Sequence, residues 1–376
     1  MTAALALVVL LAACGGGGSS TNPTPDPDPP VTPPPVTPPP VAPMLTLLAG
    51  GFNGNARDGS AEQAGFLKID SLAVDSRGLA YVGDHRAIRR INAGGEVTTL
   101  AGDLMQPGNV DGQGAAARFG PTFTPVSPDC SVFGYGRYPC LGVALDRDGP
   151  LLVADSAVGR LRSVSTTGLV SARCSSQPGW ASALGVAVNA QGVTVFVQVA
   201  VPSEMPANPV FGLFIRRCEA SASLPAYAKD VAVEDLGAMV FNDLGDLYVS
   251  DVARVESPAA TRIWRIAANG DKTLFVGESA GIGLRAGAMA FDAAGRLYLA
   301  DTAKRVVRRF SPDGTMTVLV GQLGVTTPGL QLGALPGRLS QPDALAVDRA
   351  NQRLLIGDRN DEGRPVVLTV PLAAGS

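Results

Sequence analysis

The stretch DSLAVDSRGLAYVGDHRAIRRINAGGEVTTLAG, residues 70–102, contains four short apolar segments separated by turn residues. SLAV and LAYVG flank the turn-forming DSRG, and HRAIRRI and VTTLAG flank the turn segment NAGGE. Alternation of apolar and polar residues at period two, together with many β-branched residues, favours strands. The stretch is therefore expected to form four antiparallel strands joined by tight turns.

The first half of this stretch recurs five more times along the chain, and two polar positions mark each copy. We call the one in the hairpin turn the turn position and the one that closes the second strand the strand-end position. They stand nine positions apart in five copies and ten apart in the sixth, and the third copy is degenerate. The pairs are Asp75 and Asp84, Asp146 and Asp155, Asn189 and Gln198, Asn242 and Asp251, Asp292 and Asp301, and Asp348 and Asp358.

A repeated four-stranded unit predicts an all-β fold, a six-bladed β-propeller of four-stranded antiparallel blades, over residues 44–376. The sixth copy ends after its third strand, PVVLTVPL, whereas LTLLAG at residues 45–50 precedes the first copy without a partner of its own. We therefore expect the N-terminal strand to complete the last blade and close the ring, which leaves no open sheet edge.

With a net charge of −3, the chain has no excess of positive charge to attract the phosphates of nucleic acid, so nucleic-acid binding is not expected. Arginines are frequent in the predicted third strands, where we interpret them as part of a solvated strand face. These arginines are Arg89, Arg90, Arg216, Arg217, Arg265, Arg308 and Arg309.

Residues 1–13 form an apolar segment that is too short to span a bilayer and is typical of the core of a secretion signal. Its end, LAAC, resembles the lipobox of bacterial lipoproteins, in which the chain is cut before the cysteine and that thiol becomes lipidated. The resemblance implies a lipoprotein signal peptide at 1–13 and a lipid anchor on Cys14. Because Gly15 rather than Asp follows, it also implies the outer membrane. Residues 14–43, rich in Gly, Ser and Pro, are expected to form a tether, in which a flexible Gly/Ser segment is followed by a stiff polyproline II spacer.

Four further cysteines in an exported chain predict two disulfides. Cys130 and Cys140 enclose nine residues of one inserted loop and form the expected first pair, which leaves Cys174 with Cys218. Metal binding by these cysteines is the weaker interpretation, since the sequence has no CxxC and His85 is its only histidine.

The segment ARDGSAEQAGFLKIDSLAVDSRGLAYVGDHRAIRRINAGGEVTTLAG (residues 56–102) and its partial repeat VDGQGAAARF (110–119) resemble the NHL-repeat propellers. The resemblance covers nearly all of 45–371. In physical terms the Asp-x-x-Gly of each copy is a turn signal, and the strand-end aspartate can accept backbone N–H bonds in the next turn. We interpret these repeated carboxylates as structural.

Several related six-bladed propellers are enzymes. The amidating and virginiamycin-type lyases use histidines, which a chain with one histidine cannot supply, whereas the gluconolactonase family holds a divalent cation with a Glu, an Asn and an Asp. To find such a site we align the residue five before each turn position, near the expected channel mouth. Asp70 and Asp343 lie in adjacent blades and could share a cation such as calcium, although strand-entry caps are the alternative interpretation. The aligned ring is Asp70, Leu141, Leu184, Gly237, Gly287 and Asp343.

The inserted loop CSVFGYGRYPC (130–140) is the second candidate site. Aromatic and Arg side chains on a constrained loop are typical of binding hot spots, and loops presented by a rigid scaffold often bind ligands. The alternative is that the aromatics fold down and cover the propeller face. The candidate ligand-binding residues are Phe133, Tyr135, Arg137 and Tyr138.

The sequence therefore favours a monomeric, lipid-anchored cell-envelope propeller. We expect it to act as a non-enzymatic binding or scaffold module for a protein or glycan, without catalytic residues or cofactor, touching the membrane only through its anchor. The alternative is a divalent-metal-dependent hydrolase or lactonase with its site at the channel mouth. A third possibility is a purely structural envelope protein.

Overall fold

The computed structural model describes a subset of the chain, within which it has no α-helix and only two 3-10 turns, η1 (Gly114–Ala116) and η2 (Glu278–Ala280). No helix of this part of the chain has the length and apolar character to cross a membrane. The described ranges are 42–51, 55–120, 140–147, 149–156, 159–174, 180–200, 212–218, 232–233, 236–253, 260–283 and 286–372.

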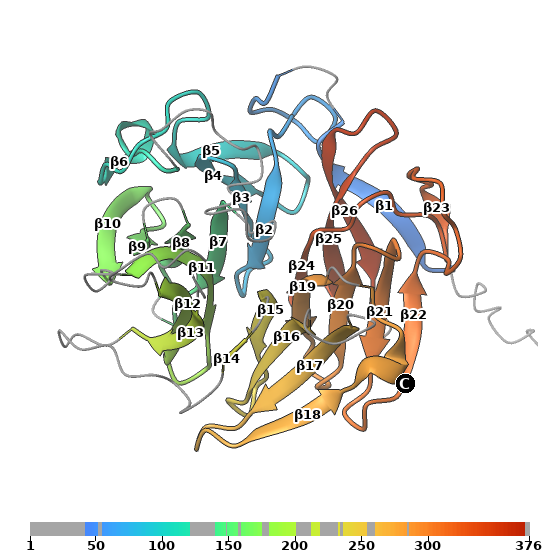
Figure 1. Cartoon of the computed structure of the whole chain (residues 1–376). Helices are drawn as coiled ribbons and strands as arrows, with labels where there is room; N and C mark the ends of the chain where they lie inside the picture. The colour runs from blue at the N-terminus through green and yellow to red at the C-terminus, as the bar shows by residue number, and fades with distance from the viewer. Residues whose placement is uncertain are drawn as a thin grey trace, which may run out of the picture. The chain divides into compact units, whose positions relative to one another are not determined.

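The strands pair into six small antiparallel sheets, four of four strands and two of five (Figure 1). The first sheet is β2 (Ile69–Val74), β3 (Ala80–Asp84), β4 (Ala87–Ile91) and β5 (Val97–Gly102). The second is β7 (Leu141–Leu145), β8 (Leu151–Asp155), β9 (Arg160–Val164) and β10 (Leu169–Cys174), with β6 (Gly112–Gln113) at its edge. The third is β11 (Trp180–Val188), β12 (Thr194–Ala200), β13 (Gly212–Arg217) and β14 (Ala232–Val233).

The remaining three sheets follow the same order along the chain. The fourth is β15 (Leu236–Phe241), β16 (Leu247–Ala253), β17 (Ala260–Ile266) and β18 (Lys272–Val276). The fifth is β19 (Ala286–Phe291), β20 (Leu297–Asp301), β21 (Val306–Phe310) and β22 (Met316–Val320). The last is β24 (Ala344–Asp348), β25 (Arg353–Arg359), β26 (Pro365–Pro371), β1 (Met44–Ala49) and β23 (Gly333–Ala334). The fold is thus an all-β propeller, in which β6 and β23 extend two sheets beyond the four strands expected.

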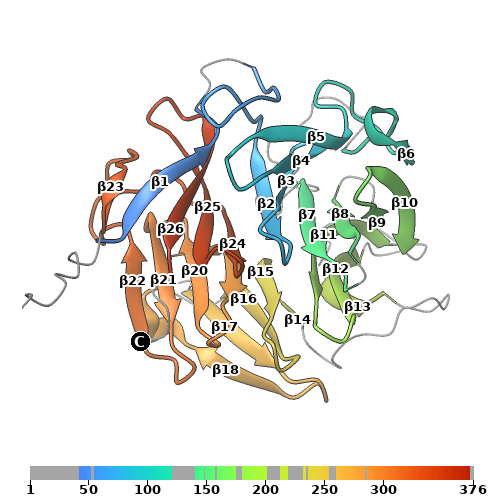
Figure 2. The same cartoon turned by 180° about the vertical axis from the view of Figure 1, so that it is seen from behind.

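The last sheet joins the two ends of the propeller. β1 pairs antiparallel with β26, with Thr46 opposite Thr369 and Leu47 opposite Leu368. Figures 1 and 2 show β1 beside β26 from both sides. The prediction that the N-terminal strand completes the last sheet is therefore confirmed, and the buried side chains of Leu45 and Leu48 hold it there.

The hydrophobic core lies between sheets. Each core cluster combines residues of two sheets that follow one another around the propeller; one cluster, for example, packs Ile69 and Val82 of the first sheet against Leu355 and Val367 of the last. Because most strands bury side chains on both faces, they are rich in Val, Leu and Ile. The first strands of the sheets, β2, β7, β11, β15, β19 and β24, contact one another in that order, and β24 contacts β2.

Each hairpin formed by the first two strands of a sheet has two ends. We call the end that holds the hairpin turn the turn end, and the opposite end, where the first strand begins and the second strand ends, the mouth end. At the turn end Asp75 Oδ1 accepts hydrogen bonds from the backbone N–H of Arg77 (2.9 Å) and Leu79 (3.0 Å). Asn189 Oδ1 accepts the equivalent bonds from Gln191 and Val193 (3.0 and 2.8 Å). An amide oxygen replaces the carboxylate here because only a neutral acceptor is needed. The interpretation of the turn positions as structural is confirmed.

At the mouth end the strand-end aspartates are buried, and they too are structural. Asp84 Oδ1 accepts hydrogen bonds from the backbone N–H of Leu67 (2.8 Å) and Lys68 (2.9 Å), and Asp358 Oδ2 accepts one from Ser340 (3.0 Å). Their acceptor role agrees with the sequence interpretation. These donors lie in the loop that leads into the sheet, whereas Asp301 also accepts a bond from the backbone N–H of Lys304 (3.1 Å) in the turn after its second strand, as the sequence predicted.

The interpretation of the third-strand arginines as a solvated face is wrong for Arg89 and Arg308. Their side chains are fully or almost fully buried, whereas Arg265 is exposed and Arg90 and Arg309 are half-buried. Successive residues of a strand point to opposite faces, so one of each Arg-Arg pair must face the adjacent sheet. Arg308 Nε lies 2.8 Å from Asp301 Oδ2, and Arg89 Nη1 lies 2.7 Å from Asp84 Oδ2.

The buried arginines explain why the loop segment 56–66 is repeated at 110–119. Arg89 Nη2 donates to Asp58 Oδ1 (2.8 Å), and its guanidinium lies 5.4 Å from the Phe66 ring. In the next sheet Arg162 Nη2 donates to Asp111 Oδ1 (2.7 Å), and its guanidinium lies 4.4 Å from the Phe119 ring. The repeated Asp and Phe therefore hold the loop against a buried arginine of the third strand.

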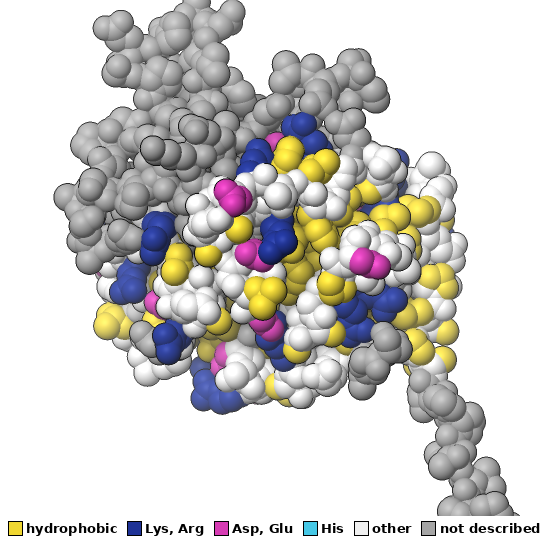
Figure 3. Space-filling view, turned by 90° about the horizontal axis from the view of Figure 1, so that it is seen from below, with side chains coloured by type: hydrophobic (Ala, Val, Ile, Leu, Met, Phe, Trp, Pro, Cys, Tyr) yellow, Lys and Arg dark blue, Asp and Glu magenta, His cyan; other side chains and the backbone are white. Residues whose placement is uncertain are grey.

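Cys174 and Cys218 form a disulfide with a Cα–Cα distance of 6.0 Å, as predicted. On the described surface in Figure 3, basic and acidic side chains are interspersed among apolar ones rather than gathered by sign. That distribution agrees with the small net charge.

Candidate functional site at the channel mouth

The first strands surround a central channel of about 120 Å³, lined mainly by Gly, Ala, Val, Leu and Met. Asp70 is the only charged residue among the described residues that line it. Ser71, the other oxygen-bearing side chain there, donates its hydroxyl to the backbone oxygen of Leu141 (2.5 Å). The channel is therefore mostly apolar, with one carboxylate at its mouth end.

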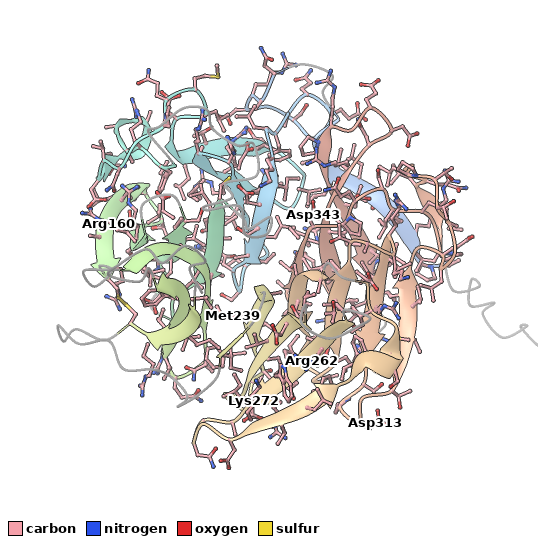
Figure 4. The ribbon with its side chains drawn as sticks, viewed as in Figure 1. Arg160, Met239, Arg262, Lys272, Asp313 and Asp343 are labelled. Carbon is pink, nitrogen blue, oxygen red and sulfur yellow. A yellow bond between two sulfur atoms is a disulfide. The ribbon has the colours of Figure 1, made fainter. Side chains whose placement is uncertain are left out.

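The ring of positions aligned from the sequence lies near the starts of the first strands, with one exception. Leu184 lies inside β11, because that strand begins earlier, at Trp180. Of the two predicted metal ligands, Asp70 lines the channel, whereas Asp343 is not among its lining residues. Asp343 lies just before β24, and its Oδ2 accepts a hydrogen bond from Gln341 Nε2 (2.9 Å) (Figure 4).

Asp70 is instead grouped with residues that the sequence analysis did not connect to it. Ligand atoms of Asp70, His85 and Cys140 all lie within 4.8 Å of one another. The Asp70 side chain is fully buried, and the Lys68 ammonium lies 2.7 Å from its Oδ1. Strand pairing brings Asp70 and His85 together, because Ile69 lies opposite Asp84. Cys140 joins them because it directly precedes β7, which packs against β2 and β3.

His85 is held in a two-residue turn between β3 and β4. Asp84 pairs with Ala87 across this turn, and His85 has the left-handed backbone conformation, with φ 56°. This conformation is unfavourable for a residue with a Cβ and often occurs at functional sites. Burial lowers the pKa of His85, Asp70 raises it, and the positive charges of Arg86 and Lys68 lower it further. His85 is therefore a neutral imidazole at neutral pH, and its Nδ1 lies 3.4 Å from Cys140 Sγ.

These three residues do not fit a divalent cation. Cys140 is disulfide-bonded, so its sulfur is not a thiolate ligand. The Lys68 ammonium is already paired with Asp70 and also lies 4.0 Å from Cys140 Sγ. A dication would have to displace this ammonium, and calcium in particular needs several oxygen ligands, which the described channel lining lacks. The cation site shared by Asp70 and Asp343 stays a prediction.

Beside this group lies a larger cavity of about 420 Å³, which we call the mouth pocket. Its polar wall consists of Lys68, His85, Arg86 and Arg359, and none of the described residues that line it is acidic. Its apolar wall consists of Leu67, Leu104 and Met105, of which Leu67 is 39 % and Met105 79 % exposed. The mouth pocket is therefore electropositive on one side and apolar on the other.

Several predicted site residues lie outside the described residues. These are the lipidation site Cys14, Cys130, and the candidate ligand-binding residues Phe133, Tyr135, Arg137 and Tyr138. The described end of their loop, Cys140, is buried beside His85. The pairing of Cys140 with Cys130 and the role of the aromatic loop stay predictions.

The mouth pocket was missed because the alignment used one position per repeat. Aligning the residue after each strand-end position instead would have placed His85 and Arg359 together, in the first and last sheets. The ion pair also had a local signal: Lys68 and Asp70 are two residues apart, a spacing that places side chains on the same side of an extended chain.

No protein-family model matches this chain, and no curated protein matches it. Among solved structures, an auxiliary nutrient binding protein from Bacteroides thetaiotaomicron aligns with a TM-score of 0.57 at 13% identity, covering 87% of this chain and 76% of that one. A gluconolactonase from Xanthomonas campestris aligns with a TM-score of 0.53 at 16% identity, covering 88% and 90%. A luciferin-regenerating enzyme aligns with a TM-score of 0.55 at 12% identity, covering 88% and 96%. At these identities the likeness establishes the β-propeller fold and not an NHL family membership.

Proposed function

We propose that this protein is a non-enzymatic binding module of the bacterial cell envelope, which presents the mouth end of a propeller to a protein or glycan partner. The observation that supports binding over catalysis is the ion pair between Lys68 and Asp70, with 2.7 Å between Nζ and Oδ1. It neutralises the one charged residue of the described channel lining. The structural likeness to a nutrient binding protein is compatible with this role.

A crosslinking pull-down from cell envelopes tests the proposal and its surface together. The bait is the wild-type chain beside a triple variant with Phe133→Ala, Tyr135→Ala and Tyr138→Ala. We expect the wild type to capture a partner that the triple variant loses. Leu244→Ala is the control, because Leu244 is 82 % exposed in a turn-end loop and its loss leaves the mouth end unchanged. Equal capture by all three proteins would contradict a binding surface formed by the aromatic residues of the loop 130–140.

We also infer that the six sheets are the six blades of one ring. The support is the cyclic order of contacts among the first strands and the pairing of β1 with β26. Deletion of residues 44–50 tests the closure. The deletion removes the buried Leu45 and Leu48 and exposes the edge of β26, so we expect a marked fall in the melting temperature. An unchanged melting temperature would contradict closure by this strand.

We propose that the chain is exported, lipidated on Cys14 and anchored to the outer membrane through the tether 14–43, with the propeller a monomer. The support is the LAAC segment followed by Gly15. Cys14→Ala should move the protein from the membrane fraction to the soluble fraction of the envelope. Persistence of the variant in membranes would contradict the anchor, and light scattering of the soluble propeller tests the monomer.

A metal-dependent hydrolase or lactonase is the second candidate. The observation in its favour is the group of three potential ligands, Asp70, His85 and Cys140, at the channel mouth. It ranks second because Lys68 occupies the carboxylate and Cys140 is disulfide-bonded. Lactone hydrolysis by the purified protein with added calcium or zinc, abolished by Asp70→Asn, would favour the enzyme. Hydrolysis at the same rate in the Asp70→Asn variant would indicate a contaminant.

A further inference from the structure

The mouth pocket contains two guanidinium groups without a carboxylate partner. Arg86 and Arg359 line it, and neither forms an ion pair with a described residue. Among the described residues, the one side-chain hydrogen bond of Arg359 runs from its Nη1 to the backbone oxygen of Gly363 (3.1 Å). The Nε of Arg86 is buried and has no hydrogen-bond partner among the described residues. A buried, unsatisfied donor on a charged group is unfavourable unless a ligand satisfies it.

The third cation of the pocket has a different role. Lys68 is paired with Asp70, so the two charges cancel, and Arg86 and Arg359 leave the pocket with an excess of positive charge. His85 is uncharged at neutral pH, because burial and the neighbouring positive charges lower its pKa. It can therefore exchange a hydrogen bond with a ligand without adding charge.

The opposite wall selects for an apolar group. Leu67 and Met105 are both exposed large hydrophobic side chains, at 39 % and 79 %, and both line this one cavity. A cavity of about 420 Å³ lies within the range of pockets that bind small organic ligands. Cations on one side and exposed apolar side chains on the other match a molecule with an anionic end and an apolar body.

We propose that the mouth pocket binds a small carboxylate ligand with an apolar body, its carboxylate on Arg86 and Arg359 and its body against Leu67 and Met105. The proposal rests on the binding function proposed above and names the chemistry of one ligand. A carboxylate fits because guanidinium groups form charge-assisted, often bidentate, hydrogen bonds with it.

The probe is 4-phenylbutyrate, titrated by calorimetry and by ligand-observed NMR against the soluble propeller. 4-Phenylbutan-1-ol has the same apolar body without the charge, and acetate has the charge without the body. We expect 4-phenylbutyrate to bind at least tenfold more tightly than either comparison molecule. Its affinity should fall as the ionic strength is raised, because part of the attraction is between charges.

Arg86→Met is the test variant, because Met keeps an unbranched apolar side chain. The Nε that is removed has no hydrogen-bond partner among the described residues, so its loss leaves none of them unsatisfied. It should weaken 4-phenylbutyrate binding at least tenfold and leave the melting temperature unchanged. Arg160→Met is the matched control: Arg160 lies at the start of β9 (Figure 4) and is not among the described residues that line the mouth pocket, so its loss should not change the affinity. Arg359→Met provides a second, independent loss of charge in the pocket.

Equal binding of the acid and the alcohol, or unchanged affinity in both Arg86→Met and Arg359→Met, would overturn the proposal, as would no detectable binding of 4-phenylbutyrate. The envelope pull-down separates this failure from that of the proposed function. Capture of a partner without 4-phenylbutyrate binding leaves the binding module standing and removes the carboxylate pocket. Binding of the acid without a captured partner supports the pocket and removes the macromolecular partner.

Discussion

Asp75 and Asp84 lie at opposite ends of one hairpin. Both positions recur as polar residues in every copy of the repeat, so the sequence alone does not distinguish them. At the turn end Asp75 accepts two backbone N–H bonds at the surface, and Asn occupies the same position in two other copies. At the mouth end Asp84 is fully buried and paired with a buried arginine. Burial raises the pKa of Asp84 to about 6, although Arg89 and backbone donors oppose this shift. The comparison teaches that burial determines what a repeated carboxylate contributes.

The largest expected effect is at the mouth end. Arg89→Met removes the counter-charge of Asp84 and three hydrogen bonds, so we expect the free energy of unfolding to fall by about 3–5 kcal/mol at pH 7. The fall should be smaller at pH 5, because the buried Asp84 can then take up a proton. Chemical denaturation at the two pH values measures both effects.

Arg90→Met is the matched control for this variant. Arg90 follows Arg89 on β4 but is half-buried and has one long hydrogen bond, from its Nε to Thr98 Oγ1 (3.4 Å). Its replacement should change the free energy of unfolding by less than about 0.5 kcal/mol. Similar losses for Arg89→Met and Arg90→Met would contradict the division of third-strand arginines by strand face.

The same replacement of carboxylate by amide should distinguish the two ends. Asp84→Asn leaves Arg89 without its buried counter-charge and should lower the free energy of unfolding by about 1–3 kcal/mol. Asp75→Asn keeps the acceptor oxygen and should lower it by less than about 0.5 kcal/mol. Parallel urea unfolding of both variants provides the comparison, and equal losses would erase the distinction between the ends.

Asp358 provides a pH test, because no buried arginine pairs with it among the described residues. Burial raises its pKa to about 6 in the folded protein, above the value near 4 of an unfolded carboxyl. Its contribution to stability is therefore fully present below about pH 4 and is lost as the pH rises through about 6. Asp358→Asn should flatten this part of the pH profile of the free energy of unfolding by an amount on the order of 2 kcal/mol. A profile identical to the wild type would show that Asp358 does not titrate there.

The smallest effect concerns the turn itself. Asp75→Ala removes the acceptor for the N–H groups of Arg77 and Leu79, and the free energy of unfolding should fall by about 1 kcal/mol. Thermal unfolding beside Asp75→Asn separates loss of the acceptor from loss of charge. If both variants lost equal stability, the charge rather than the hydrogen bonds would define the turn position.

Local repetition was sufficient to predict the strands, the turns and the partner of β1, since each depends on short-range propensity or on one unpaired segment. Asp70 was also identified, but its closeness to His85 and Cys140 was not. Its contact with His85 and Cys140 arises from pairing across β2 and β3 and from packing against β7, which no single repeat records. The mouth pocket likewise combines residues 67 and 359, which approach each other only through the fold.

The sequence by itself determined an all-β repeated architecture, the closing role of the N-terminal strand and, from the even number of cysteines, the expectation of disulfides. These follow from periodicity and from counting, which are properties of the chain alone. Only the tertiary structure decided that Arg89 is buried, that Asp70 is neutralised by Lys68, and that Arg86 and Arg359 face one cavity. The physical reason is that burial and charge pairing depend on which strand face meets the adjacent sheet, and this contact is formed between residues far apart in the chain.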